Sequence, residues 1–122
     1  MQIIFQSFAT IFFAGENNME IKYITKNNAL VAKLYGDLDE YTAEYVRMSL
    51  DKILSDVNFV MGASVILDFS HVSFMDSTGI GVLIGRYKKY QKKQVNLQIA
   101  NPPAQVDRIL KMAGIYSLMP LI

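Results

Sequence analysis

The chain has 122 residues, which is enough for one domain that buries a core without disulfides or a structural metal. It contains no cysteine, and this excludes disulfide frameworks, cysteine zinc sites and thiol catalysis. Its 12 basic and 11 acidic residues give a net charge of +1, so the composition lacks the broad basic character of a nucleic-acid-binding domain, and the apolar share of 52% predicts an ordered globular protein.

The first 18 residues differ from the rest of the chain. The stretch Ile3 to Phe13 is apolar and aromatic, but polar residues interrupt it and it is too short to span a membrane. It also lacks the basic start and small-residue cleavage site of a secretory signal. Because strand-like alternation begins at Met19, and Gly15-Glu16 can be encoded by a sequence resembling a bacterial ribosome-binding site, we expect Met19 to be the natural start. The alternative is that residues 1–18 form a real extra strand or an amphipathic anchor.

Two strands and a helix are predicted next. Residues Met19 to Tyr23 alternate between apolar and charged, and a second run extends from Ala29 to Tyr35, so the two runs predict an antiparallel hairpin. The segment Gly36 to Asp39 breaks the second strand, and Asp39 is expected to cap the helix that follows. That helix has apolar residues at helical spacing, which predict one stripe packed on a sheet: Ala43, Val46, Leu50, Ile53, Leu54 and Val57.

The second half of the chain predicts two more strands and two more helices. The apolar run Val65 to Phe69 is bounded by polar residues, which is the pattern of a central strand covered on both faces. A helix from Ser77 to Lys92, a strand from Val95 to Ile99 and a helix that starts after Pro102-Pro103 and ends at Gly114 complete the order. The pattern predicts an α/β domain: a mixed β-sheet with an N-terminal hairpin followed by parallel strands, flanked by α-helices.

The segment Ser73 to Gly81, with the sequence SFMDSTGIG, is the main candidate for a functional site. Function gathers in the loops beyond the carboxyl ends of parallel strands, and residues 36–41 and 70–78 form two such loops. Ser77 lies at the expected start of a helix, where unpaired N–H groups and the positive end of the helix dipole favour a phosphate. Taken alone, this position suits catalysis, capping or modification.

The helix after Ser77 carries glycines that reduce its stability. Gly81 and Gly85 lie one turn apart, and each costs about 1 kcal/mol relative to alanine. They either admit the backbone of a partner or let the helix pack tightly on its own sheet, and the sequence favours neither. The expected core stripe consists of Ile80, Leu83, Ile84 and Tyr87. The cations near the helix end are expected to form a solvated face rather than a nucleic-acid site: Arg86, Lys88, Lys89, Lys92 and Lys93.

The sequence does not match known catalytic motifs. Gly79, Gly81 and Gly85 lack the spacing of a dinucleotide-binding loop, and Ser77 lacks the G-x-S-x-G context of a serine hydrolase. The only histidine, His71, is expected at the surface or in a local hydrogen bond rather than in a triad. Four aspartates could gather around magnesium, but caps and turns explain them more simply: Asp37, Asp39, Asp68 and Asp76. We therefore expect no self-contained enzyme, no metal and no cofactor.

Two segments resemble the motifs of a known family. Residues 74–88 (FMDSTGIGVLIGRYK) are similar to the signature of the STAS domain of anti-sigma factor antagonists, especially the anti-sigma F factor antagonist of spore-forming bacteria. Residues 36–44 (GDLDEYTAE) resemble the family's other hallmark, a G-E-L-D segment followed by T-A. The resemblance runs from Met19 to about Leu118, so residues 19–122 are expected to be a STAS domain.

The resemblance implies a phosphorylation switch. In that family the serine directly after the aspartate is phosphorylated, which corresponds to Ser77, while Thr78 replaces the usual second serine. The implied partners are an anti-sigma factor that is also a serine kinase, and a separate serine phosphatase that removes the phosphate. We expect a cytoplasmic protein without nucleic-acid or membrane partners. The expected partner surface comprises Asp37, Asp39, Tyr41, Asp76, Ser77, Thr78, Gly79, Gly81 and Gly85.

One departure from the family concerns the C-terminus. Members usually continue past the last short strand into a C-terminal helix, whereas this chain stops at Ile122, soon after Pro120. The expected consequence is an uncovered apolar patch on the sheet, which the N-terminal extension or a second copy would cover. The oligomeric state therefore stays open.

Two alternatives remain beside the antagonist. One is a STAS adaptor subunit of a lipid or anion transport system, and the other is a small serine hydrolase that uses Ser77. Within the antagonist family, the sequence does not distinguish a regulator of sporulation from a regulator of general stress.

Overall fold

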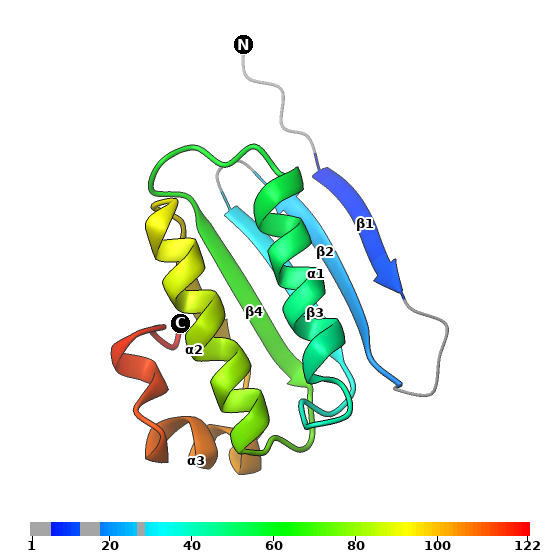
Figure 1. Ribbon diagram of the computed structural model, residues 1–122, viewed down its shortest axis with the longest axis vertical. Coiled ribbons are helices and arrows are strands. Elements are labelled where there is room, and N and C mark those ends of the chain that lie inside the picture. The colour runs from blue at the N-terminus through cyan, green and yellow to red at the C-terminus, as the bar shows by residue number, and fades with distance from the viewer. Residues whose placement is uncertain (1–5, 13–17, 27–28) are drawn as a thin grey trace.

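The computed structural model describes residues 6–12, 18–26 and 29–122, which form a mixed sheet with helices packed on it (Figure 1). The strands are β1 (Gln6–Phe12), β2 (Glu20–Lys26), β3 (Ala29–Tyr35), β4 (Ser64–His71) and β5 (Asn96–Ala100). The helices are α1 (Ala43–Asp56), α2 (Ser77–Lys92) and α3 (Ala104–Met112), followed by a short 3-10 turn, Ile115–Ser117. The sheet order is β1-β2-β3-β4-β5, antiparallel across the first three strands and parallel across the last three. The predicted α/β architecture is confirmed.

The predicted hairpin consists of β2 and β3. Its register places Ile21 opposite Leu34, and both side chains are fully buried, as are those of Leu30 and Ala32. Successive side chains of a strand point to opposite faces, so the alternation read from the sequence directs these four residues toward the core. The turn residues 27–28 lie outside the described part of the chain.

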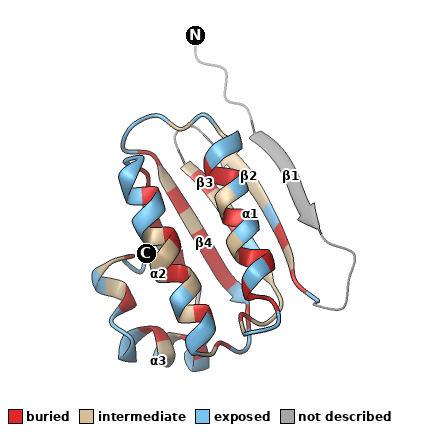
Figure 2. Ribbon diagram, in the orientation of Figure 1, coloured by how far each residue is buried: buried red, intermediate tan, exposed pale blue. Residues whose placement is uncertain are grey.

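The helices α1 and α2 lie side by side on one face of the sheet (Figure 1). Each buries the side that contacts the sheet and exposes the opposite side (Figure 2). Helix α1 buries the predicted stripe from Ala43 to Leu54, and the boundaries of α2 are those expected from the sequence. Gly114 has a left-handed φ of 72° just after α3, as expected of a residue that ends a helix.

The expectation that β4 is covered on both faces is wrong. Val65 and Leu67 are buried, but Ile66 between them is only half-buried and lies outside the hydrophobic core. Its register partner Val31 on β3, and Ile24 on β2 opposite Val31, are also half-buried, so an apolar row crosses β2, β3 and β4 on the open face of the sheet. The cause is topological. Strand order follows chain order from β3 to β5, and crossovers of one hand then place α1 and α2 on the same face.

A second correction concerns Arg86, which is not part of the solvated cation face. Its side chain is 9% exposed, and its Nε lies 2.9 Å from Oδ1 of Asp51 on α1. This contact is an ion pair without hydrogen-bond alignment. Lys89 adds a second cation 3.3 Å from Oδ2 of Asp51. Nearby, the buried hydroxyl of Tyr90 donates to the C=O of Leu50 at 2.6 Å, and burial raises the pKa of this phenol. These contacts tie α2 to α1.

Both edges of the sheet carry terminal segments of the chain. At one edge β1 pairs with β2 along its whole length, so in the structure part of the N-terminal extension forms an extra strand. The proposal that Met19 is the natural start stays a prediction, and residues 1–5 and 13–17 lie outside the described ranges. At the other edge, the N–H of Ile99 donates to the C=O of Pro120, and the N–H of Ile122 donates to the C=O of Ile99, both at 2.9 Å.

Candidate functional site

The segments that follow β3 and β4 are hydrogen-bonded to each other, and we call residues 36–42 and 72–76 the paired loops. The N–H of Gly36 donates to the C=O of His71 at 3.2 Å, and the N–H of Leu38 donates to the C=O of Phe74 at 3.0 Å. The N–H of Asp76 donates back to the C=O of Leu38 at 3.3 Å. The two loops that were predicted beyond the strand ends therefore form one connected element.

Asp76 holds the two loops and the start of α2 together. It is the N-cap of α2, where its Oδ1 accepts a hydrogen bond from the N–H of Gly79 at 3.0 Å. Its Oδ2 accepts from the N–H of Glu40, on the opposite loop, at 3.2 Å. One carboxylate thus satisfies an orphan amide of the helix and also fixes the neighbouring loop against it.

Asp39 organises a turn rather than the helix itself. Its Oδ1 accepts from the N–H groups of Tyr41 and Thr42, at 2.9 and 3.2 Å. The N-cap of α1 is Thr42, so the expectation that Asp39 caps this helix is wrong by one turn. The reason is that the turn from Asp39 to Thr42 precedes the helix, with the N–H of Ala43 donating to the C=O of Asp39 at 2.9 Å. Thr42 is itself anchored, since its hydroxyl donates to the C=O of Asp37 at 2.6 Å.

The three glycines of α2 have different surroundings. A Cβ on Gly79 would lie 2.5 Å from the C=O oxygen of Leu38, so only glycine fits where the helix meets the opposite loop. A Cβ on Gly81 or Gly85 would meet no atom within 4 Å. Tight packing on the protein's own sheet therefore does not explain Gly81 and Gly85. Gly79, in contrast, is buried and joins the two loops rather than offering surface to a partner.

Ser77 and Thr78 are exposed in the first turn of α2. Among the described residues, neither hydroxyl has a hydrogen-bond partner. The first amides of a helix have no acceptor within it, and the cap formed by Asp76 satisfies that of Gly79. The helix start therefore keeps donors and partial positive charge that suit a phosphate on Ser77.

An apolar groove that the sequence did not reveal adjoins Ser77. It has a volume of about 420 Å³ and is lined by Met75, Asp76, Ser77, Ile80, Ile109, Met112 and Ala113. Met112 on α3 is 82% exposed, and on the paired loops Tyr41 and Phe74 are 69% and 46% exposed. Of these three, only Tyr41 was predicted as a contact residue. The groove forms where α2 meets α3, and no local motif signals such a junction.

The family model for the STAS domain matches residues 20–122. The chain belongs to the STAS domain family. One curated relative of this STAS domain is an anti-sigma F factor antagonist from Paenibacillus polymyxa, 31% identical over 104 residues that cover 85% of this chain and 86% of that protein. An anti-sigma-B factor antagonist from Staphylococcus epidermidis is 29% identical over 102 residues, which cover 84% of this chain and 91% of that protein.

Solved structures agree with the STAS fold. The Bacillus anti-sigma factor antagonist SpoIIAA in its unphosphorylated form superposes with a TM-score of 0.65 at 22% identity, over 95% of this chain and 88% of that chain. Its phosphorylated form superposes with a TM-score of 0.57 at 21% identity, over 95% and 91% of the two chains. At these identities the structures show the fold, which is the fold that the resemblance predicted.

The remaining candidate residues of the STAS domain make local contacts. His71 Nδ1 lies 3.1 Å from Oγ of Ser70, and its ring lies 4.6 Å from that of Tyr35, while none of its described contacts involves Ser77. Asp37 accepts from the hydroxyl of Ser73 at 3.0 Å, which adds one more link between the paired loops.

Neither a metal centre nor a membrane span is evident in the described ranges. Asp68 accepts from the N–H of Ser70 at 2.9 Å, so it closes a turn as Asp39 does. Within the described residues, no three carboxylate or imidazole side chains come together as a metal site requires. No helix in this part of the chain has the length and apolar character that a bilayer crossing needs.

Proposed function

We propose that this STAS domain is an anti-sigma factor antagonist that binds its anti-sigma factor when unphosphorylated and is switched off by phosphorylation of Ser77. The observation that carries the proposal is the position of Ser77. It is exposed, has no hydrogen-bond partner among the described side chains, and lies on a helix start that the paired loops hold in place. The names of the curated relatives support the same role.

The proposed partner surface combines the paired loops with the adjoining flank of α2. Gly81 and Gly85 leave that flank bare, so another backbone can approach it closely. The exposed ring of Tyr41 and the groove that Ser77 and Met112 line offer apolar contact to a partner. We assign Gly79 a supporting role, since it is buried against Leu38.

The switch acts through charge. A phosphate on Ser77 adds about −1.5 to −2 charges beside Asp76, and the helix start tolerates this in the free protein. A complex that buries the phosphate without a cationic partner loses on the order of 2–5 kcal/mol. Affinity then falls roughly 30-fold to several-thousand-fold, which is enough to release the anti-sigma factor without any change of fold.

Substitutions at Ser77 test the proposal against the anti-sigma factor of the same organism. We expect Ser77→Ala to bind persistently in the presence of ATP, because the partner's serine kinase activity finds no acceptor. We expect Ser77→Asp to bind at least about 30-fold more weakly than Ser77→Ala. The matched control is Thr78→Ala, which should still be phosphorylated and released, as mass spectrometry and titration calorimetry would show. Equal affinity of Ser77→Ala and Ser77→Asp would eliminate the charge switch.

We further propose that the domain is a cytoplasmic regulator and not an enzyme, and that a separate serine phosphatase restores it. The local contacts of His71 support this view, since they involve Ser70 and Tyr35 rather than Ser77. A fluorophosphonate probe should therefore leave Ser77 unlabelled. The relatives include both a sigma F and a sigma B antagonist, so the genes adjacent to this one are the best guide to the pathway.

A further inference from the structure

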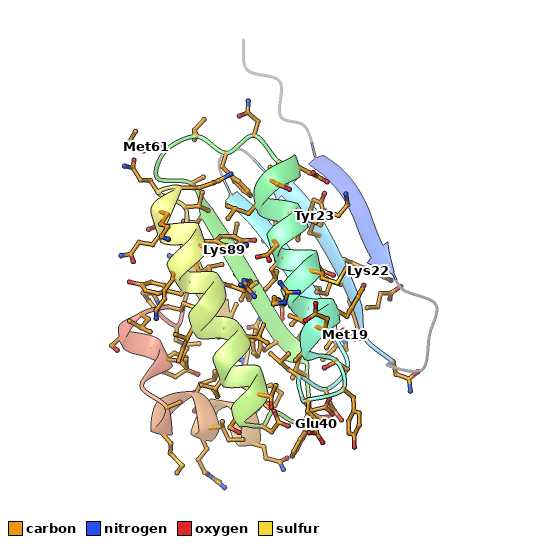
Figure 3. All side chains as sticks on the ribbon, viewed as in Figure 1. Met19, Lys22, Tyr23, Glu40, Met61 and Lys89 are labelled. Carbon is orange, nitrogen blue, oxygen red and sulfur yellow. The ribbon has the colours of Figure 1, made fainter. Side chains whose placement is uncertain are left out.

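The end of the molecule opposite the paired loops carries a second distinctive surface. Residues 57–63, which we call the distal loop, join α1 to β4 at the far end of both helices (Figure 1). In Figure 3, Met61 on the distal loop and Glu40 on the paired loops lie at opposite ends of the protein. Whatever binds the distal loop therefore leaves the candidate site accessible.

The distal loop presents apolar side chains to solvent in an ordered turn. Val60 is 60% exposed and Met61 is 78% exposed. The turn is held by backbone hydrogen bonds, from the N–H of Ala63 to the C=O of Val60 at 3.0 Å and from the N–H of Gly62 to the C=O of Gln94 at 2.8 Å. Phe59 packs against the core beneath them. Two adjacent apolar side chains are thus fixed at the tip instead of folding inward.

Lysines occur at the end of α2 that adjoins the distal loop. Residues 88–93 at the end of α2 include four lysines and no acidic residue. Lys93 lines a cavity of about 270 Å³ together with Asn58 and Phe59 of the distal loop. Among the described residues, Lys88, Lys92 and Lys93 have no ion-pair partner, while Asp56, at the end of α1, is already paired with Lys52 at 2.8 Å.

The lysine-containing end of α2 and the paired loops therefore differ in charge, although the net charge of the whole chain is only +1. The paired loops contain four acidic residues and no basic one: Asp37, Asp39, Glu40 and Asp76. Stabilisation of the helix end explains why lysines occur in the last turn of α2. It does not explain why exposed aliphatic side chains occur at the same end of the protein.

We propose that the distal loop and the lysines of α2 dock this protein on the surface of an anionic lipid bilayer. Lysines near an anionic membrane are attracted electrostatically, and Val60 and Met61 are placed to enter the headgroup region. A nucleic acid would use the lysines but would gain little from the aliphatic tip. The proposal departs from the expectation, made from the sequence, that the protein has no membrane partner; docking on a surface needs no membrane-spanning segment. The binding is reversible, since it combines one small apolar tip with a few charges.

Vesicle flotation of the full-length protein tests the proposal. The protein should float with vesicles of about 30% phosphatidylglycerol and 70% phosphatidylcholine at low ionic strength. It should not float with vesicles of pure phosphatidylcholine, because the attraction depends on the negative charge of the lipid. The double variant Val60→Ser with Met61→Ser should bind at least about tenfold more weakly. The double variant Lys92→Gln with Lys93→Gln should bind roughly twenty- to thirtyfold more weakly.

Matched controls carry the same changes elsewhere. Phe74→Ser with Met112→Ser removes exposed apolar side chains at the opposite end, and Lys33→Gln with Arg108→Gln removes two other exposed cations. Both should float as the unmodified protein does. Circular dichroism and thermal melting identify any variant that is misfolded.

Two results would overturn the proposal. The first is the absence of binding to the phosphatidylglycerol vesicles at low ionic strength. The second is unchanged binding of the Val60→Ser, Met61→Ser variant, because the lysines alone would then account for binding. In that case the surface would be a general site for polyanions, and duplex DNA would compete with the vesicles for it. Neither result bears on the switch at Ser77, since that test uses the opposite end of the molecule.

Discussion

At the scale of single residues, the carboxylate of Asp76 contributes most to the shape of the candidate site, with one oxygen on the helix and the other on the opposite loop. We expect Asp76→Ala to lower the free energy of unfolding by about 1–2 kcal/mol, because it removes a helix cap and a link between loops. Asp76→Asn keeps an oxygen acceptor and should lose about half as much or less. Urea denaturation measures both, and a stability of Asp76→Ala equal to that of the unmodified protein would contradict the capping role.

Two glycines a few residues apart should respond oppositely to alanine. At Gly79 the new Cβ would lie 2.5 Å from backbone oxygen, so we expect a loss of about 1–3 kcal/mol in stability. At Gly81 the Cβ enters open space inside a helix, so we expect a gain of about 0.5–1 kcal/mol. If Gly81 serves partner approach, the same Gly81→Ala variant binds the anti-sigma factor more weakly although it is more stable. Thermal denaturation and a binding titration on one sample separate the two effects.

Residue-level prediction from the sequence succeeded where the determinants are local. Ser77 follows a capping aspartate and precedes a glycine-containing apolar pattern, and this is enough to locate the start of α2. Asp39 failed as a cap for α1 because a complete extra turn, closed by its own side chain, comes before the helix. Propensity cannot tell a turn that precedes a helix from the first turn of that helix.

At the scale of elements, one ion-pair cluster fastens α1 to α2. Asp51 on α1 contacts Arg86 and Lys89 on α2, and the guanidinium of Arg86 is nearly buried. We expect Asp51→Ala to lower the free energy of unfolding by about 1–3 kcal/mol, because it leaves this guanidinium without a counter-charge. Lys52→Ala is the control, since it breaks an exposed pair with Asp56 and should change stability by less than about 0.5 kcal/mol. Chemical denaturation of both variants should show this difference, and similar losses would refute it.

The burial of Arg86 could not be predicted from the sequence. On its own helix it begins a run of cations, which usually marks a solvated face. Its ion-pair partner, Asp51, lies 35 positions earlier on another helix. Only the packing of α1 beside α2 brings the two side chains together and buries the guanidinium (Figure 1). The groove beside Ser77 escaped prediction for the same reason, because residues of α3 form one of its walls.

At the scale of the whole molecule, the open sheet face bears on association. Its apolar row of Ile24, Val31 and Ile66 is bordered by exposed Lys22 and Lys33. Among the described side chains, these three fall well short of the roughly 1,200 Å² that a stable dimer interface buries. We therefore expect a monomer at micromolar concentration in sedimentation velocity. A dimer that persists below about 1 µM would show that the open face, or the β1 edge, pairs with a second copy.

The open face of the sheet was not predicted from the sequence. The open face is not the patch that a missing C-terminal helix is expected to leave, and that expectation stays a prediction. The open face follows from placing α1 and α2 on one side of the sheet, and strand order rather than any residue pattern determines that placement. The sequence of a short apolar strand such as β4 does not distinguish a strand with one covered face from a strand with two.

The pairing of Ile99 with the C-terminal segment has a practical consequence for anyone who handles this protein. An edge strand exposes unpaired amides and carbonyls, to which a strand of another molecule can hydrogen-bond. Here Pro120 and Ile122 already bond to part of the edge of β5. Trimming Pro120 to Ile122 would remove little of the core yet expose fresh backbone on β5. We therefore expect a version of the protein that lacks these residues to aggregate more readily. A tag placed after Ile122 needs a flexible spacer, so that it does not displace this segment from β5.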